Sequence, residues 1–282
     1  MKRRDFLKIT AAAILSTGAA QDVLAGIEKS DSEKSDKNDR HIKDYLHKMH
    51  NFDQPNDNDI YLDKANLRIL KSSVARLKRL EKTVGHANFY LLNFDEALKI
   101  SRGYSRVGRF SKKEINFLES IFYKNSSIYG FFGKKPLKDM TSRIKKKEVI
   151  KISHTGNYLY KGDACAAYKK LKKEIGDTVI LTSGVRSIIK QFLLFLGKTY
   201  RNKGNLSLAS RSLAPPGYSF HGIGDFDVGQ VGFGYDNFTE RFTTTKVFKK
   251  LQKFGYINLR YTENNLLGVR FEPWHIKITN RV

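Results

Sequence analysis

Two short segments near the C-terminus hold the residue types that a catalytic metal site requires. One contains His221 and Asp227, and the other contains Glu272 and His275. Two imidazoles and one carboxylate are a common ligand set for catalytic zinc, which keeps a further position for water. Glu272 lies three residues before His275, near enough to act as a general base without binding the metal. The spacing therefore predicts a zinc site that activates water.

The loop between His221 and Asp227 contains two glycines. It reads Gly222-Ile223-Gly224, and glycine allows backbone conformations that other residues avoid. A sharp turn there would bring both side chains to one point, while His275 would arrive from a distant strand.

The first residues resemble an export signal. A basic start that includes Arg3 and Arg4 precedes an apolar run over 9–20, which is shorter than the roughly 20 residues of a membrane span. The arginine pair resembles the twin-arginine signal, and cleavage sites follow Ala20 and Ala25. We therefore expect a protein of the periplasm or cell envelope. The alternative is an uncleaved amphipathic anchor.

The chain of 282 residues is strongly basic, with a formal net charge of +24. Such a charge favours polyanions such as nucleic acid, anionic lipid or cell-wall polymer. Export argues against nucleic acid, so we expect any such partner to be an anionic wall polymer or a membrane surface. The alternative is that the lysines only cover solvated helix faces. The single Cys165 excludes an internal disulfide, and its neighbours indicate a buried helix face.

The pattern divides the chain into four parts. Residues 1–25 are the signal, 26–58 a flexible polar linker, 59–148 a helical region and 149–282 the domain with the metal motifs. In the helical region, apolar residues recur at three- and four-residue steps at Leu67, Leu70, Val74, Leu77 and Leu80. Ser111 with Glu114 forms a capping box.

The last part alternates between short strands and helices, which predicts an α+β class with a small mixed or antiparallel sheet and flanking helices. Strands are expected at 149–152, 178–181, 226–228, 268–271 and 276–278, and helices at 163–175, 188–198 and 244–254.

Three motifs in this part together resemble the VanY-type zinc D-alanyl-D-alanine carboxypeptidases, which are LAS-type peptidoglycan peptidases. They are Thr-Ser-Gly-Val-Arg-Ser at 182–187 with Gln191 four residues on, Pro-Pro-Gly-Tyr-Ser-Phe-His at 215–221 followed by Gly224 and Asp227, and Glu-Pro-Trp-His at 272–275. The resemblance covers roughly the C-terminal half of the chain.

The resemblance implies a role for each matching residue. Zn²⁺ would be bound by His221, Asp227 and His275, and Glu272 would activate the water. Arg186 would stabilise the charge that develops on the scissile carbonyl oxygen. The residues that would contact substrate are Ser187, Gln191, Ser219 and Trp274.

The sequence departs from the family pattern at two positions. The family places its aspartate seven residues after the first histidine, where this chain has Val228. A one-residue deletion before Phe226 brings Asp227 into place, and Asp225, which shares its strand face, is the alternative ligand. Val185 replaces a tyrosine that is common in the family, which affects substrate contacts rather than the metal.

These inferences predict an exported zinc peptidase that acts on peptidoglycan stem peptides, most simply by removing a C-terminal D-alanine. Cleavage as an L,D-carboxypeptidase or an endopeptidase is the alternative within the same class. A different alternative is a basic, non-catalytic envelope protein that has kept the fold for binding.

Overall fold

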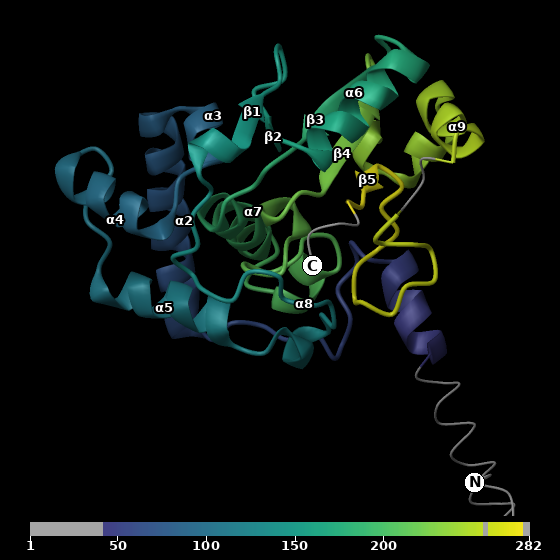
Figure 1. Ribbon diagram of the computed structural model, residues 1–282. Helices are drawn as coiled ribbons and strands as arrows, with labels where there is room; N and C mark the ends of the chain where they lie inside the picture. The colour runs from purple at the N-terminus through teal and green to yellow at the C-terminus, as the bar shows by residue number, and fades with distance from the viewer. Residues whose placement is uncertain (1–41, 256–258, 279–282) are drawn as a thin grey trace, which may run out of the picture. The chain divides into compact units, whose positions relative to one another are not determined.

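The C-terminal part of the chain is built around a three-stranded antiparallel sheet (Figure 1). In this computed structural model, which describes residues 42–255 and 259–278, the strands are β3 (Val179–Ser183), β4 (Phe226–Gln230) and β5 (His275–Ile276). β4 is the central strand. It carries Asp227 of the first metal motif and pairs with β5, which carries His275 of the second. The predicted α+β class with a small antiparallel sheet and flanking helices is confirmed.

Helices and one hairpin surround this sheet. The hairpin pairs β1 (Val149–Lys151) with β2 (Tyr158–Tyr160). The helices are α2 (Lys64–Val84), α3 (His86–Phe89), α4 (Phe94–Gly103), α5 (Lys112–Tyr123), α6 (Asp163–Ile175), α7 (Ile188–Arg201), α8 (Leu206–Ser210) and α9 (Lys246–Lys253). The short 3₁₀ helices are η1 (Ser126–Tyr129), η2 (Lys146–Glu148), η3 (Phe220–Gly222), η4 (Gly234–Phe238) and η5 (Glu240–Thr244).

The register of the sheet places three polar residues side by side. Asp227 on β4 pairs with Ser183 on β3 and with His275 on β5. A shift in register between Leu181 and Ser183 leaves Thr182 as an extra residue on β3, which is the mark of a β-bulge. Because directly paired residues project from the same face of a sheet, this register brings the side chains of Asp227 and His275 together.

The helices begin where the sequence offers caps. The predicted capping box at the start of α5 is present, with Ser111 and Glu114 each bonding the other's backbone N–H. Ser187 caps α7 in a simpler way, since its hydroxyl accepts a hydrogen bond from the backbone of Lys190. The helix that follows immediately after the Arg186 motif is therefore fixed at its first turn.

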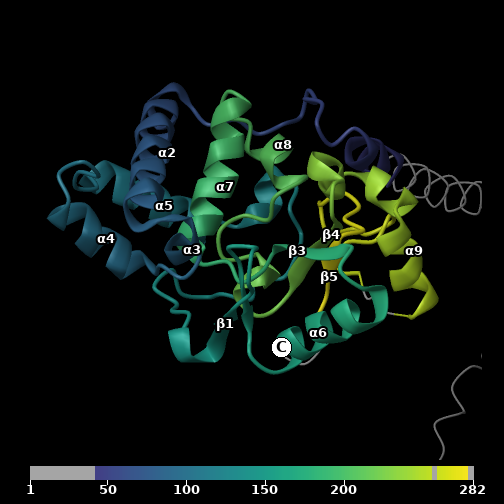
Figure 2. The same cartoon turned by 90° about the horizontal axis from the view of Figure 1, so that it is seen from above.

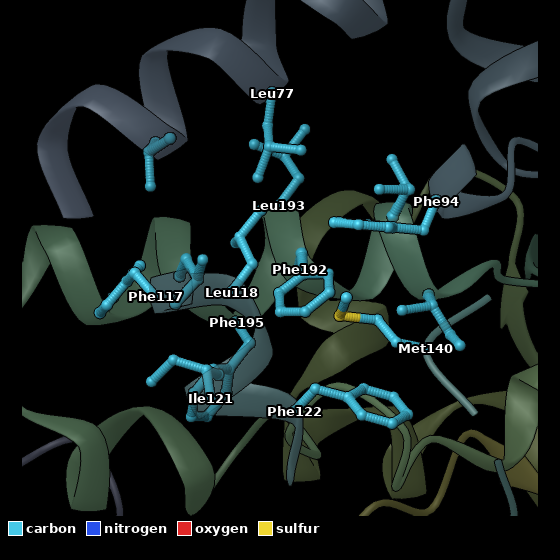
Figure 3. Packing of buried hydrophobic residues seen from close by; sticks show 14 of the residues in the cluster. Leu77, Phe94, Phe117, Leu118, Ile121, Phe122, Met140, Phe192, Leu193 and Phe195 are labelled. Carbon is cyan, nitrogen blue, oxygen red and sulfur yellow. The ribbon is translucent and has the colours of Figure 1, made fainter. Parts of the chain in front are cut away.

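The apolar face of α7 packs into a core formed largely by the N-terminal helices. Figure 2 shows α2 and α7 running side by side, and Figure 3 shows Leu77 of α2 and Leu118 of α5 beside Phe192 of α7. A second core lies between the sheet and helices α6 and α9, around Phe226 and Leu251. The first core thus contains residues from both sides of position 148.

Contacts divide the chain into two units, Met1–His47 and Lys48–Val282. The predicted boundary between 148 and 149 stays a prediction, although a single core crosses it. Residues 42–50, in the predicted linker, are helical. The predicted signal at 1–25 and the linker up to 41 lie outside the described residues. In the part of the chain that the structure describes, no helix is long and apolar enough to cross a membrane.

One predicted strand is wrong. Residues 268–271 form an irregular segment, and the neighbouring strand covers 275–276 instead of the expected 276–278. Gly268 has a φ of +79°, and a side chain there would collide with the carbonyl oxygen of Gly130. The segment bonds to loops rather than to a strand, since the N–H of Arg270 donates to the carbonyl of Arg211. Val269 is buried in the first core and Phe271 is half-buried, so the alternation of residue types that predicts a strand arises here without one.

Candidate metal centre and substrate cavity

The structure brings the three predicted metal ligands to one point. One ligand atom from each of His221, Asp227 and His275 lies within 4.8 Å of the others, and all three residues are buried. They come from η3, β4 and β5, so the glycine-containing loop and the sheet register both contribute. Among the residues that the structure describes, this is the only such group.

A backbone carbonyl orients the ring of His221. Its Nδ1–H donates to the carbonyl oxygen of Gly184 over 2.9 Å, which leaves Nε2 free to act as a ligand at 3.3 Å from Asp227 Oδ2. Residue 184 is itself packed closely against β2. A Cβ at this position would meet the carbonyl oxygen of Tyr158, so the backbone can take this place only because residue 184 is glycine.

The ring of His275 lies between two carboxylates. Nδ1 is 3.0 Å from Asp227 Oδ1, and Nε2 is 2.9 Å from Asp225 Oδ2. Asp225 also accepts hydrogen bonds from the guanidinium of Arg260 and from the backbone of Ile278. Because these partners occupy both of its oxygens, Asp225 is placed to orient His275 rather than to bind the metal. Asp227, the preferred ligand of the two, lies within the group.

The charges of this cluster support each other. Burial alone would raise the pKa of both aspartates, but the histidines beside Asp227 hold its pKa well below the ordinary range. The hydrogen bond from His275 and the charge of Arg260 lower the pKa of Asp225 to about 2. Burial, followed by the charge of Arg186, lowers the pKa of His221. Metal binding requires an ionised Asp227 and two neutral imidazoles. Burial alone would lower the pKa of His275, but the hydrogen bonds and charges of Asp225 and Asp227 outweigh it and raise this pKa to about 10, so a metal that binds here has to displace a proton from the ring.

Asp225→Asn is expected to weaken zinc binding about 10- to 100-fold without abolishing it, because outer carboxylates fix the ring of a ligating histidine. Zinc dissociation constants by competition with a chromophoric chelator measure this directly. The exposed Asp177→Asn serves as the control, since Asp177 pairs only with Lys172 at the surface. An affinity equal to that of the wild type would contradict an orienting role.

Glu272 lies beside the three ligands but is not one of them. Its Oε2 is 4.0 Å from His275 Nδ1, and only 9% of the residue is exposed. Burial raises the pKa of Glu272 to about 7, against the charges of His275 and Arg270, which lower it. A carboxyl group whose pKa is near neutrality can both take up and release a proton, as a general base must.

The guanidinium of Arg186 is held over the same site. One nitrogen donates to Ser183 Oγ at 2.8 Å and lies 3.6 Å from Asp227 Oδ2, and another donates to Gln191 Oε1 at 3.2 Å. Its buried Nε has no hydrogen-bond partner within the described residues. Arg186 is therefore a fixed cation that retains a donor for a further acceptor.

The four residues predicted to contact substrate fall into two groups. Ser219 and Trp274 line the cavity at the metal ligands. Ser187 caps α7 and donates to the carbonyl of Phe89, whereas Gln191 bridges Arg186 and the carbonyl of Ala214. The structure assigns the side chains of Ser187 and Gln191 to holding α7 and Arg186, and a direct substrate contact for them stays a prediction.

The cavity that contains the ligands has a volume of about 670 Å³. Its walls include side chains that the sequence did not single out, among them Tyr90, Tyr261, Lys198 and Arg270. Tyr261 is buried with its ring 5.1 Å from that of His275. Lys198 alone carried a signal, because a lysine at a four-residue step from Leu194 is unusual on such an apolar helix.

The donor set fits zinc. Two imidazole nitrogens and one carboxylate form the usual ligand set of a catalytic zinc site. Bonds of about 2.0–2.2 Å in a tetrahedron separate the ligand atoms by about 3.4 Å. His221 Nε2 lies 3.3 Å from Asp227 Oδ2, close to that value, and the whole group, with one ligand atom from each residue, lies within 4.8 Å.

Comparison with known proteins agrees with this geometry. Residues 161–280 match the family model described as VanY, D-alanyl-D-alanine carboxypeptidase. The resemblance that the three motifs predict is therefore confirmed for this part of the chain. No curated protein matches the sequence significantly.

Several solved structures are similar to part of this chain. The LD-carboxypeptidase LdcB is 26% identical over 43% of this chain, with a TM-score of 0.36, and the match spans 58% of the length of LdcB. A mutant of the D,D-pentapeptidase VanY in complex with Zn(II) is 22% identical over 54% of this chain and 88% of its own, with a TM-score of 0.39. VanYB in complex with D-alanine-D-alanine is 22% identical over 52% of this chain and 83% of its own, also with a TM-score of 0.39.

Proposed function

We propose that this chain, which carries a VanY-type D-alanyl-D-alanine carboxypeptidase domain at residues 161–280, is a zinc enzyme that removes a C-terminal D-alanine from peptidoglycan stem peptides. One observation carries the proposal. The three metal-binding side chains meet at the wall of a cavity that also contains Glu272 and Arg186. A binding protein would have no need of a buried carboxyl group beside a metal site.

The chain's own groups divide the work of hydrolysis. Zinc, held by His221, Asp227 and His275, would supply Lewis acidity that polarises the scissile carbonyl and lowers the pKa of the attacking water. Glu272 would take the proton from this water and return it to the leaving amine. Arg186, held by Ser183 and Gln191, would stabilise the negative charge that develops on the carbonyl oxygen.

The test uses purified protein, defined muropeptides and elemental analysis. We expect about one zinc per chain and the loss of a single terminal D-alanine from pentapeptides. Removal of zinc with a chelator should stop the reaction, and added zinc should restore it. Cleavage of tetrapeptides alone would indicate L,D specificity, and an internal cut would indicate an endopeptidase. Protein without metal or cleavage would favour the non-catalytic binding alternative.

We also propose export by the twin-arginine route, on the basis of Arg3 and Arg4 ahead of the apolar run at 9–20. Changing both arginines to lysine is expected to leave the precursor in the cytoplasm, as cell fractionation and the mass of the chain would show. The same double change at Arg102 and Arg106, which lie far along the sequence, is the control. Unchanged export of the Arg3 and Arg4 variant would point to the general secretory route.

A further inference from the structure

Three cations line the substrate cavity without a carboxylate partner. They are Lys198 and Arg201 on α7 and Arg270 on the irregular segment before β5. Among residues 42–255 and 259–278, no carboxylate oxygen lies within 4.0 Å of their charged nitrogens. Arg270 is buried, Lys198 is half-buried and Arg201 is exposed at the rim. Two other buried cations of this region do have such partners, because Arg211 pairs with Asp59 and Lys190 pairs with Glu81.

Arg270 is the most deeply placed of the three. It is 9% exposed, and its buried Nε has no hydrogen-bond partner within the described part of the chain. One other nitrogen donates to the carbonyl of Phe238, and the guanidinium lies 4.8 Å from the ring of Trp274. A buried guanidinium that keeps an unused donor is costly unless an acceptor reaches it.

The ammonium group of Lys198 lies close to this guanidinium. Burial, followed by the charges of Arg270 and Arg201, lowers the pKa of Lys198 to about 8, although Asp53 and Glu272 act in the opposite direction. Its Nζ donates to Ser212 Oγ, a neutral acceptor that supplies no negative charge. The three cations therefore repel one another, and an anion between them would relieve the repulsion.

The cluster is continuous with the candidate catalytic centre. Lys190, Leu194, Lys198 and Arg201 recur at steps of four, four and three along α7, so they share the helix face that lines the cavity. Arg270 is only two residues before Glu272 in the chain. A substrate whose scissile bond lies at Glu272 thus extends past these cations within the same cavity.

We propose that Lys198, Arg201 and Arg270 form an anion subsite, which binds a carboxylate of the substrate peptide other than the carbonyl under attack. This inference rests on the proposed peptidase function. The carboxylate has two possible sources in a stem peptide, namely the C-terminus and an acidic side chain.

Burial favours a peptide over a polymeric anion. Arg270 lies inside a cavity of about 670 Å³ that also contains the metal ligands, a size that suits a short peptide rather than a polymer chain. A polyanion binds through many exposed charges along a surface, and a nine-tenths buried guanidinium is poorly placed for that.

The test uses zinc-loaded protein and three synthetic peptides of one sequence ending in D-Ala-D-Ala. The parent has free carboxylates, one analogue has an amidated C-terminus, and the other an amidated acidic side chain. We expect amidation at one of the two sites to lower kcat/KM about 10-fold or more, because hydrogen bonds to charged groups are strong. The sensitive analogue identifies the source of the carboxylate.

The double variant Lys198→Met with Arg201→Gln is expected to lose most of this preference, so that the parent-to-analogue ratio of kcat/KM approaches one. Arg102→Gln is the matched control, since Arg102 is likewise an exposed last-turn arginine of a helix, α4, but is not among the residues that line the cavity. An equal decrease for all three peptides in the double variant would overturn the subsite, and so would a wild type that does not discriminate.

Calorimetric binding of the same peptides separates this proposal from the proposed function. If no peptide is cleaved but the parent still binds about 10-fold more tightly than one analogue, and the double variant loses that difference, the subsite stands while the enzymatic function fails. Poly(glycerol phosphate) is the competing probe. Two results together would overturn the proposal: the polymer binds the wild type but not the double variant, and the wild type binds the three peptides equally. The cations would then be assigned to a polymeric anion.

Discussion

Replacing Glu272 with glutamine is expected to lower kcat about 10²- to 10⁴-fold while zinc stays bound, because the change removes a general base but none of the three ligands. Glutamine has nearly the same shape, so the buried site keeps its packing. The decrease should appear in kcat rather than in KM, since the amide still fills the wall of the cavity but cannot take the proton from water.

Three measurements together test this assignment: zinc content, kcat and KM on a pentapeptide, and the thermal midpoint of unfolding. Glu263→Gln is the matched control, because Glu263 is an exposed glutamate in the same C-terminal segment. If the Glu272 variant keeps more than about a tenth of the wild-type kcat, another group accepts the proton and the assignment fails. If it loses zinc, Glu272 is a ligand.

The second large effect is expected at Asp227. Asp227→Asn should weaken zinc binding more than about 100-fold, because it removes a ligating carboxylate. The loss of a partner outside the ligand set costs at most about 100-fold. It also removes the negative charge next to Arg186 and both histidines, which leaves the buried guanidinium of Arg186 without that nearby carboxylate. Peptide cleavage should fall with the zinc content.

Asp225→Asn, which changes the other acidic residue of the same strand face, provides the comparison. The order of zinc affinities should be wild type, then Asp225→Asn, then Asp227→Asn. The reverse order for the two variants would show that Asp225 is the ligand and that the one-residue deletion was placed wrongly. Activity regained by Asp227→Asn at high zinc concentration would support a loss of affinity rather than of folding.

The candidate metal site could be predicted from sequence to a large extent, because its residue types are rare and lie in short motifs. His221, His275 and Glu272 each stand in a segment whose spacing implies chemistry. The choice between Asp225 and Asp227 could not be made in the same way, since both residues share one strand face. The pairing of Asp227 with His275 favours Asp227 as the ligand, and that pairing is a property of the sheet.

Elements with local signals were also predictable. The helices at 64–84, 112–123 and 163–175 follow apolar periodicity or a capping box, and the structure contains them. The expected strand at 268–271 fails because the segment begins at a glycine with a positive φ and its Val269 packs in the helical core rather than in a sheet. The cations of the cavity were missed because Lys198 and Arg270 lie 72 residues apart in sequence (270 − 198) and meet only through tertiary packing.

The two faces of α7 have a consequence for any attempt to isolate a minimal catalytic fragment. One face lines the substrate cavity, and the other buries Phe192, Phe195 and Leu196 against the N-terminal helices. A chain cut near residue 161, where the family match begins, would expose these three side chains to water. Such a fragment would aggregate before its activity could be measured, so the smallest soluble enzyme should retain α2 to α5.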